Sequence, residues 1–166
     1  MAVRCNETLP DEVLKKMGAP PKADDAVATP DALVNFDAIL FGIPTRFGMA
    51  PAQMKALMDS TGQLWQSGSL IGKPAGIFFS TGTQNGGQET TALTFITQLV
   101  HHGMIFVPMG FSTPLLFDLA APHGGSPYGS GTIAGPDGSR MPSELEKQMA
   151  VHHGQHFGAV VTKFAK

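Results

Sequence analysis

Short apolar runs alternate with stretches of helical spacing along this chain. Ala38 to Phe41 is an unbroken apolar run, which is typical of a strand buried on both faces. Residues 74–80 predict a second buried strand, and residues 104–109 predict a third. Helical spacing predicts a helix over residues 51–59 and another from Gln88 to His102. A strand-helix repeat of this kind predicts an α/β fold with a doubly wound parallel sheet.

Helix-end signals predict three further helices. Pro10 opens a short helix that Gly18 ends, and Thr29-Pro30-Asp31 reads as a cap, a first-turn proline and a carboxylate at a helix start. Ser143 to Glu146 forms a capping box before a long C-terminal helix. Residues 60–72 and 110–140 are expected to be loops.

The composition predicts a single domain over residues 1–166 and narrows the class of protein. The 11 basic and 13 acidic residues leave no basic patch for nucleic acid. Cys5 is the sole cysteine, so no intrachain disulfide can form. No stretch is long enough for an integral membrane segment, and the first residues lack a hydrophobic signal core. A cytoplasmic protein is therefore expected, with peripheral membrane association as a second location.

Polar and glycine-rich loops follow each predicted strand. They are residues 42–48, residues 80–87 and the stretch from Gly110 onward. Because the carboxyl ends of parallel strands meet at one edge, we expect these loops to form the binding site. The first places a hydroxyl, a guanidinium and a ring together, and the second offers hydroxyls, amides and uncovered backbone N–H groups.

Other catalytic patterns are absent or incomplete. Residues 68–74 resemble a phosphate-binding loop, but they have too few residues between the glycines and precede a strand. His152 and His156 have metal-binding spacing, yet no carboxylate follows His152, so we expect a helix face and no metal. Two alternatives stay open for Trp65, a core anchor or a platform that stacks on a flat ring.

Six ordered motifs carry a resemblance to a known family. They are Pro-Thr-Arg-Phe-Gly-Met from residue 44, Ser60 to Trp65, Ser-Thr-Gly-Thr from residue 80, Gly-Gly-Gln-Glu-Thr-Thr from residue 86, His-His-Gly-Met from residue 101, and Gly-Ser-Pro-Tyr-Gly from residue 125 with Asp-Gly-Ser-Arg from residue 137. The chain resembles the WrbA family of flavodoxin-like NAD(P)H:quinone oxidoreductases, which bind FMN. The resemblance implies a flavodoxin-like doubly wound sheet.

The same resemblance implies a set of site residues. Arg46 and His101 would be catalytic, with Arg46 stabilising negative charge on the flavin and His101 giving a proton to the quinone. Trp65 would wall the pocket where nicotinamide and quinone stack in turn. The residues implied to contact FMN are Thr45, Arg46, Phe47, Ser80, Thr81, Gly82, Thr83, Gln84, Asn85, Gly86 and His101.

The implied activity is a two-electron relay from NADH or NADPH through FMN to a quinone, in a homotetramer whose pockets neighbouring subunits complete. Gln63 replaces a usual glycine, and Gln84-Asn85 adds a residue to the flavin loop. The family's first strand, first helix and most of its second strand, with the Ser-x-Tyr-Gly-His loop for the FMN phosphate, are expected to be absent. That would expose the edge of the Ala38 to Phe41 strand.

Two alternatives to the enzyme are open. One is a catalytically impaired fragment or splice form that acts as an interaction subunit with intact paralogues. The other is an FMN-binding regulator with little turnover. Retention of flavin by the purified chain distinguishes the interaction subunit from the two flavin-binding proteins.

Overall fold

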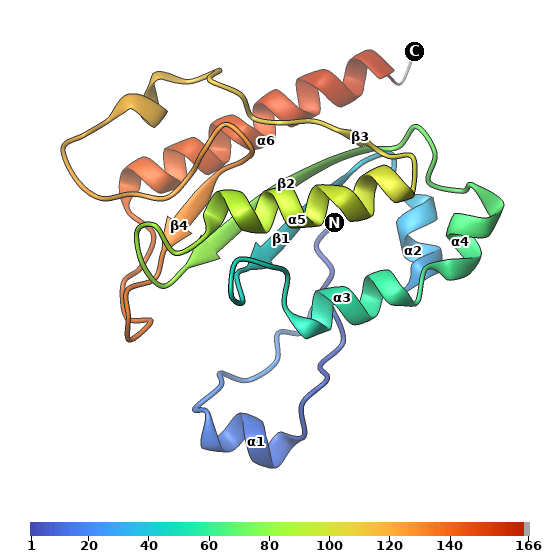
Figure 1. Cartoon of the computed structure of the whole chain (residues 1–166), viewed down its shortest axis with the longest axis horizontal. Coiled ribbons are helices and arrows are strands. Elements are labelled where there is room, and N and C mark those ends of the chain that lie inside the picture. The colour runs from blue at the N-terminus through green and yellow to red at the C-terminus, as the bar shows by residue number, and fades with distance from the viewer. Residues whose placement is uncertain (165–166) are drawn as a thin grey trace.

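The computed structural model describes residues 1–164, in which helices alternate with the strands of one sheet (Figure 1). The strands are β1 Ile39–Pro44, β2 Pro74–Thr81, β3 Ile105–Phe106 and β4 Gly131–Ile133. The helices are α1 Asp11–Lys16, α2 Pro30–Asn35, α3 Ala52–Asp59, α4 Gly62–Ser67, α5 Gln88–His101 and α6 Glu144–Phe164, with the short 3-10 helix η1 Pro114–Phe117.

Strand β2 is the centre of the parallel sheet. β1 runs along one side of it, with Ile39 opposite Ala75 and Pro44 opposite Ser80. On the other side, β3 pairs with the first two residues of β2 and β4 pairs with Phe79 to Thr81. The predicted α/β class with a parallel sheet is therefore confirmed.

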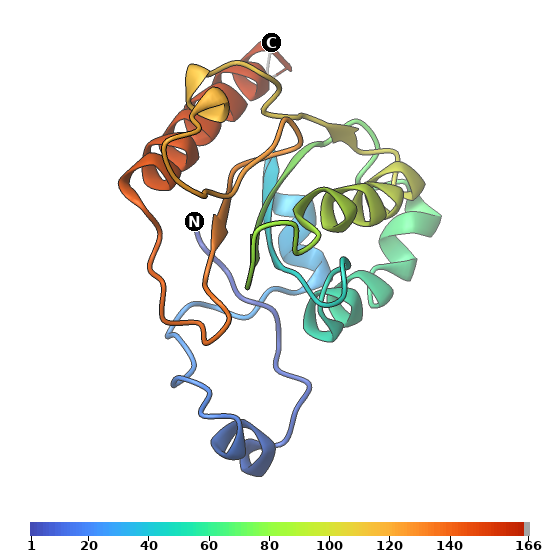
Figure 2. The ribbon, with the colours of Figure 1, turned by 60° about the vertical axis from the view of Figure 1, so that its left-hand side comes forward.

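Helices cover both faces of the sheet. Figure 2 shows the sheet between α6 on one side and α3, α4 and α5 on the other. On the α5 face, the rings of Phe41 and Phe95 lie 5.2 Å apart, and Ile77 and Phe79 are buried beside them. On the α6 face, the ring of Phe157 lies over Gly76, which leaves no room there for a side chain. The core therefore lies mainly between the sheet and α5.

The predicted helix ends agree with the structure at several points. The Thr29 hydroxyl accepts a hydrogen bond from the Ala32 N–H at the start of α2. At the start of α6, the Ser143 hydroxyl accepts from the Glu146 N–H, and a Glu146 oxygen accepts from the Ser143 N–H. These are the reciprocal bonds of a capping box.

Three parts of the prediction were wrong. Residues 62–67, expected in a loop, form α4, and the strand expected over 104–109 is the two-residue β3. The expected loop over 110–140 contains η1 and β4. The chain leaves the sheet after β3 and returns as β4 farther along β2, so two short segments occupy one side of that strand.

The edge of the Ala38 to Phe41 strand was expected to be exposed, and this strand is β1. Among the strands of residues 1–164, β1 pairs with β2 alone. On the neighbouring β2, the ring of Phe78 packs over Gly42 and is still 45% exposed. Part of this sheet face therefore remains open beside α6. No helix within the described part of the chain has the length and apolar character needed to cross a bilayer.

Candidate functional site

Two loops leave the carboxyl ends of β1 and β2 side by side. Pro44 lies opposite Ser80, and the Thr45 N–H donates to the Ser80 carbonyl oxygen at 2.9 Å. The structure therefore brings Thr45, Arg46 and Phe47 to the same edge as Ser80 to Gly86, as the sequence predicted. Whether these residues contact a ligand stays a prediction.

The first loop reverses the chain tightly. The Arg46 N–H donates to the Met49 carbonyl at 2.8 Å, and the Met49 N–H donates back to the Arg46 carbonyl at 3.1 Å. Phe47 has a φ of 54°, which costs a residue with a side chain about 1 kcal/mol, and its ring is fully exposed. The strained turn thus presents an aromatic face to solvent beside the exposed Arg46 guanidinium.

The first loop is attached to the start of α5. The hydroxyls of Thr45 and Thr91 lie 2.6 Å apart, and the Thr91 hydroxyl donates to the Gly87 carbonyl at 2.7 Å. Thr45 must then donate to Thr91, because Thr91 has its hydrogen on Gly87. Gly48 packs against Thr90, where a side chain on Gly48 would come within 2.7 Å of the Thr90 hydroxyl.

Hydrogen bonds within the second loop hold its conformation. The buried Thr81 hydroxyl donates to the Thr83 carbonyl at 2.9 Å, and the Gly86 N–H donates to the same oxygen at 3.2 Å. Within the described residues, the N–H groups of Gln84 and Asn85 have no acceptor in the protein. They are therefore free to donate to a ligand or to water.

A cavity of about 340 Å³ lies beside the second loop. It separates the loop and the start of α5 from the segment around His123 to Ser126. Its lining residues are Thr83, Gln84, Asn85, Gly87, Gln88, Glu89, Thr90, His123, Gly125, Ser126 and Ile133. Most of these side chains are polar, so the cavity suits a ligand that accepts and donates hydrogen bonds.

The third segment at this edge follows β4, and the expectation that it begins at Gly110 was wrong. The Ala134 N–H donates to the Thr81 carbonyl at 2.8 Å, which holds residues 134–140 beside the second loop. Gly110 follows β3, which pairs only with the amino end of β2. The strand predicted over 104–109 is shortened to β3, and a separate segment from the expected loop, β4, pairs with the carboxyl end of β2.

His101 and Trp65 lie at the other end of the sheet. Helix α5 begins at the second loop and has 14 residues, so its rise places His101 about 20 Å away. Next to it, the Gly103 carbonyl accepts from the Gly72 N–H just before β2 begins, and Trp65 is exposed on the nearby α4 (Figure 1). One chain does not bring His101 or Trp65 to the two loops.

His102 has a structural environment that differs from that of its exposed neighbour. Its side chain is buried, and its Nε2 lies 2.7 Å from the Thr61 hydroxyl. Burial, with a smaller contribution from the charge of His101, lowers the pKa of His102 below its usual range. The histidine pair therefore contains one exposed ring and one ring that ties α5 to the start of α4.

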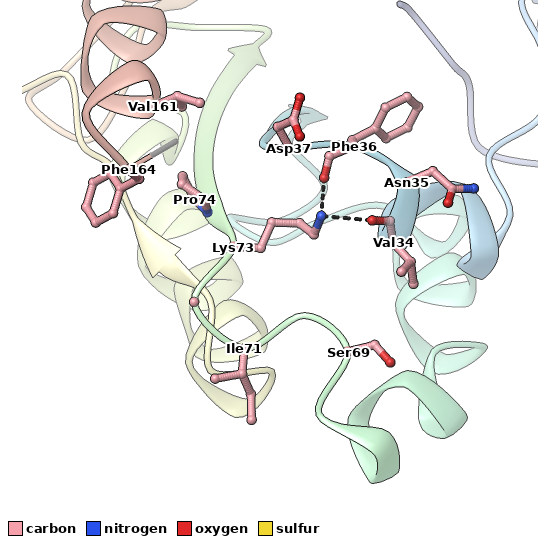
Figure 3. A pocket seen from close by; sticks show the side chains of 11 residues that line it. Val34, Asn35, Phe36, Asp37, Ser69, Ile71, Lys73, Pro74, Val161 and Phe164 are labelled. Atoms are coloured by element: carbon pink, nitrogen blue, oxygen red, sulfur yellow. Dashed lines mark hydrogen bonds between the residues drawn. The ribbon is translucent and has the colours of Figure 1, made fainter. Parts of the chain in front are cut away.

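A second cavity, of about 380 Å³, lies at the amino end of β2 (Figure 3). The Lys73 ammonium points toward the end of α2 and donates to the carbonyls of Val34 and Phe36. Val161 and Phe164 of α6 form the opposite wall. This cavity contains none of the site residues expected from the sequence, and Lys73 serves there to cap α2.

The two spaced histidines of α6 lie side by side. The rings of His152 and His156 stack with centroids 6.3 Å apart, and the Nε2 of His152 lies 2.8 Å from the Ser112 hydroxyl. In the described residues, no group of three or more His, Cys, Asp or Glu side chains is arranged to hold a metal ion. His152 instead connects α6 to the segment before η1.

Gln88 and Thr91 have roles that were not predicted from the sequence. Both stand in the Gly-Gly-Gln-Glu-Thr-Thr motif, but neither was assigned a contact. Thr91 holds Thr45, and Gln88 holds Thr81. Their position gave a usable signal, because polar residues in the first turn of a helix that follows a predicted binding loop lie close enough to contact that loop.

The chain matches a known protein family and several named proteins. Residues 3–114 match the model of a family described as NADPH-dependent FMN reductase. Quinone-oxidoreductase QR2 of Triphysaria versicolor is 61% identical over 158 residues, which are 95% of this chain and 77% of that protein. NAD(P)H quinone oxidoreductase PST3 of Candida albicans is 57% identical over 159 residues, which are 95% of this chain and 80% of that protein.

A solved structure agrees with the fold. It is described as a flavodoxin, WrbA-like protein from Agrobacterium tumefaciens, and it superposes with a TM-score of 0.62 at 22% identity. The match covers 80% of this chain and 71% of the other. The flavodoxin-like fold predicted from the sequence is therefore confirmed.

Proposed function

The chain belongs to the NADPH-dependent FMN reductase family, and we propose that it is an FMN-dependent NAD(P)H:quinone oxidoreductase. The observation that carries the proposal is the close similarity, over nearly the whole chain, to proteins named as quinone oxidoreductases. NADH or NADPH would be the electron donor, and a quinone would be reduced to a hydroquinone by two electrons.

The second loop has the donors that the polar edge of a flavin requires. A flavin presents carbonyl oxygens and ring nitrogens along one edge, and the free N–H groups of Gln84 and Asn85 can donate to such acceptors. Gly86 keeps this loop compact, because a side chain there would come within 2.8 Å of the Thr83 carbonyl. The residues present therefore fit the group.

The first loop would hold the other side of the cofactor. The exposed ring of Phe47 can stack on a flat heterocycle, and the Arg46 guanidinium can donate to an anionic or carbonyl oxygen beside it. When bound, FMN supplies the hydride chemistry. Residues 45–47 and 80–86 would hold the cofactor, and Arg46 would place positive charge near it.

His101 and Trp65 join this site only if another copy of the chain supplies them, since in one chain they lie at the far end of α5 and on α4. We therefore propose an oligomer, and specifically the homotetramer that the resemblance implies. In it, Trp65 would wall the substrate pocket, and His101 would give a proton to the quinone oxygen. A cytoplasmic location likewise stays a prediction.

Reconstitution of the purified chain with FMN tests the proposal. After desalting, we expect the protein to retain flavin absorbance and to oxidise NADH or NADPH only when a quinone is present. We expect Arg46→Ala to weaken FMN binding or lower kcat/KM about tenfold, as expected for loss of a charge-assisted hydrogen bond.

Lys16→Ala is the matched control. Lys16 lies on α1, which has no buried residue and stands away from the sheet in both ribbon views. This variant should keep wild-type affinity and turnover. A folded chain that binds no FMN overturns the proposal and favours the interaction subunit. A chain that binds FMN but does not reduce quinones favours a regulator.

A further inference from the structure

Gln88, the first residue of α5, uses its side-chain amide to join three separate segments. Its Nε2 donates to the Thr81 hydroxyl at 3.1 Å and to the Thr132 carbonyl at 3.0 Å. Its Oε1 accepts from the Gly125 N–H at 2.7 Å. An amide can make these bonds together because it has two donor hydrogens and one acceptor oxygen.

The bond to Thr81 continues into the second loop. Because the Thr81 hydroxyl accepts from Gln88, its own hydrogen is free to donate to the Thr83 carbonyl at 2.9 Å. The Gly86 N–H donates a hydrogen bond to that same carbonyl oxygen. Gln88 thus acts, through one hydroxyl, on the carbonyl that closes the Thr83 to Gly86 turn.

Two glycines make room for this side chain. A side chain on Gly131 would come within 2.6 Å of the Gln88 Oε1, and one on Gly124 within 2.8 Å of its Nε2. The close approach of the backbone is therefore required for the amide to reach its partners. Side chains at either glycine would therefore displace the Gln88 amide.

Glu146 holds the two segments that the Gln88 amide contacts outside the second loop. The Gly124 N–H donates to the Glu146 Oε1 at 2.9 Å, and the Thr132 hydroxyl donates to its Oε2 at 3.0 Å. Glu146 belongs to α6, so Gln88 connects the loop after β2 to a segment that is fixed by a helix on the opposite face of the sheet. Because Glu146 fixes the segments that Gln88 contacts, the Gln88 amide can restrain the loop after β2.

We propose that Gln88 is a positioning residue that holds the Thr81 to Gly86 loop in its flavin-binding conformation. This inference rests on the proposed function, because it assumes that the loop binds FMN. Gln88 acts through Thr81 and the backbone and does not need to touch the cofactor. Without it, the loop must be ordered when FMN binds, so affinity falls while the loaded site is unchanged.

The test compares FMN affinities of full-length variants, measured by quenching of flavin fluorescence. We expect Gln88→Ala to raise the Kd for FMN about tenfold, which corresponds to one or two lost hydrogen bonds. At saturating FMN, the variant should regain the absorption spectrum and kcat of the wild-type chain. A role only in overall stability would lower the melting temperature of the FMN-free chain and leave the Kd unchanged.

Gln88→Glu keeps the size of the side chain and removes its N–H donors. A carboxylate oxygen would face the Thr132 carbonyl, and the Thr81 hydroxyl would turn toward the carboxylate and away from Thr83. We expect a Kd at least as high as that of Gln88→Ala. Wild-type affinity in Gln88→Glu overturns the proposal, and this variant also serves if Gln88→Ala fails to fold.

A double-mutant cycle separates this path from direct contacts of Thr81. The effects of Gln88→Ala and Thr81→Val on the Kd should not add, because both break the same bond. Additive effects would overturn the role through Thr81. Gln98→Ala is the control, since Gln98 lies on the same helix and its side chain makes no hydrogen bond within the described residues.

The outcome for the wild-type chain keeps the two proposals apart. If the wild-type chain binds no FMN, the proposed function fails. If it binds FMN and both Gln88 variants bind it equally well, only the positioning role fails.

Discussion

Glu146 is a buried carboxylate that five donors surround. Burial alone would raise its pKa, but the N–H groups of Ser143 and Gly124, the Arg140 guanidinium and the Thr132 hydroxyl outweigh burial and lower the pKa to about 2. The fifth donor is the Ile133 N–H. The carboxylate therefore joins the capping box of α6 to β4 and to the segment that contacts Gln88.

We predict that Glu146→Gln lowers the free energy of unfolding at pH 7 by about 3 kcal/mol, because Arg140 loses its buried partner. The folded-state pKa is depressed, so this stabilisation is full above the unfolded value of 4.5 and declines as pH falls toward 2. Urea unfolding at pH 7 and pH 3 should show the difference between variant and wild type shrinking at the lower pH.

Glu144→Gln is the control for that prediction. Glu144 is in the same turn of α6, but its side chain is exposed and pairs only with Lys147. The change should alter the free energy of unfolding by less than about 0.5 kcal/mol. An equal Glu146→Gln effect at pH 7 and pH 3 would contradict the ionic role of Glu146.

His153 is a buried base with one orphaned nitrogen. Its Nδ1 accepts from the Ser130 N–H at 3.2 Å, and its Nε2 has no partner in the described structure. Burial, followed by the charges of His156 and His152, lowers its pKa to about 4. Folding thus favours the neutral ring.

The sign of the resulting pH dependence follows from that lowered pKa. Stability from the neutral ring is full above pH 6.5, falls by about 3 kcal/mol as pH drops from 6.5 to 4, and levels off below 4. We predict that His153→Gln removes this part of the pH dependence in unfolding curves measured from pH 7 to 4. His156→Gln should retain most of it, because burial is the larger cause of the lowered pKa. Identical slopes for wild type and His153→Gln would refute the prediction.

Among the secondary-structure elements, those with signals in their own residues could be predicted. Thr29 and Ser143 mark helix starts, and Gly103 marks the end of α5 with a φ of 68°. The strands β1 and β2 are buried apolar runs with several paired residues each. Such signals depend on local chemistry and do not need knowledge of distant partners.

The elements that were missed depend on tertiary contacts. Helix α4 has few apolar residues, and its buried Leu64 packs in the main core. β3 and β4 total five residues and exist because each finds a free section of β2. Segments this short have no periodicity of their own, so the neighbouring strand determines their position.

Substitution by alanine should change the free energy of unfolding in opposite directions at two glycines in different elements. Gly76 of β2 lies beneath α6, and a Cβ there would lie 2.6 Å from Leu40 and 3.2 Å from the Phe157 ring. Gly158 of α6 is exposed and has open space around it. We predict that Gly76→Ala lowers the free energy of unfolding by about 1 to 3 kcal/mol.

Gly158→Ala should raise the same quantity by about 0.5 to 1 kcal/mol, because alanine loses less conformational entropy in a helix. Both values come from chemical denaturation under one set of conditions. Destabilisation by both variants would contradict the assigned exposure of this α6 position, and tolerance of Gly76→Ala would contradict close packing of α6 on the sheet.

At the scale of the whole molecule, the strand order accounts for the meeting of the two loops but not for the expected roles of His101 and Trp65. Thr45 and Ser80 meet because parallel strands end at one edge, which the strand order implies. The similarity in sequence adds His101 and Trp65, but a helix that follows a strand runs back toward the opposite edge. Their roles therefore stay a prediction that requires a second copy of the chain, and the pattern of one sequence does not reveal how copies pack together.

This geometry leads to a complementation prediction. If Arg46 of one chain and His101 of another form one pocket, the variants Arg46→Ala and His101→Ala should each have low quinone reductase activity. Refolding them together in equal amounts should restore about a quarter of the pockets, those that combine a native Arg46 with a native His101 from a different copy. Activity in the mixture should then exceed that of either variant refolded alone.

The alternative geometry makes the opposite prediction. If each pocket used residues of one chain only, every pocket in the mixture would carry one of the two substitutions, and mixing would give the average of the separate activities. Light scattering of the same samples must show an oligomer, because recovery requires two copies in contact. Average activity in a verified mixed oligomer would remove His101 from the pocket, since α5 holds it about 20 Å from the loops of its own chain.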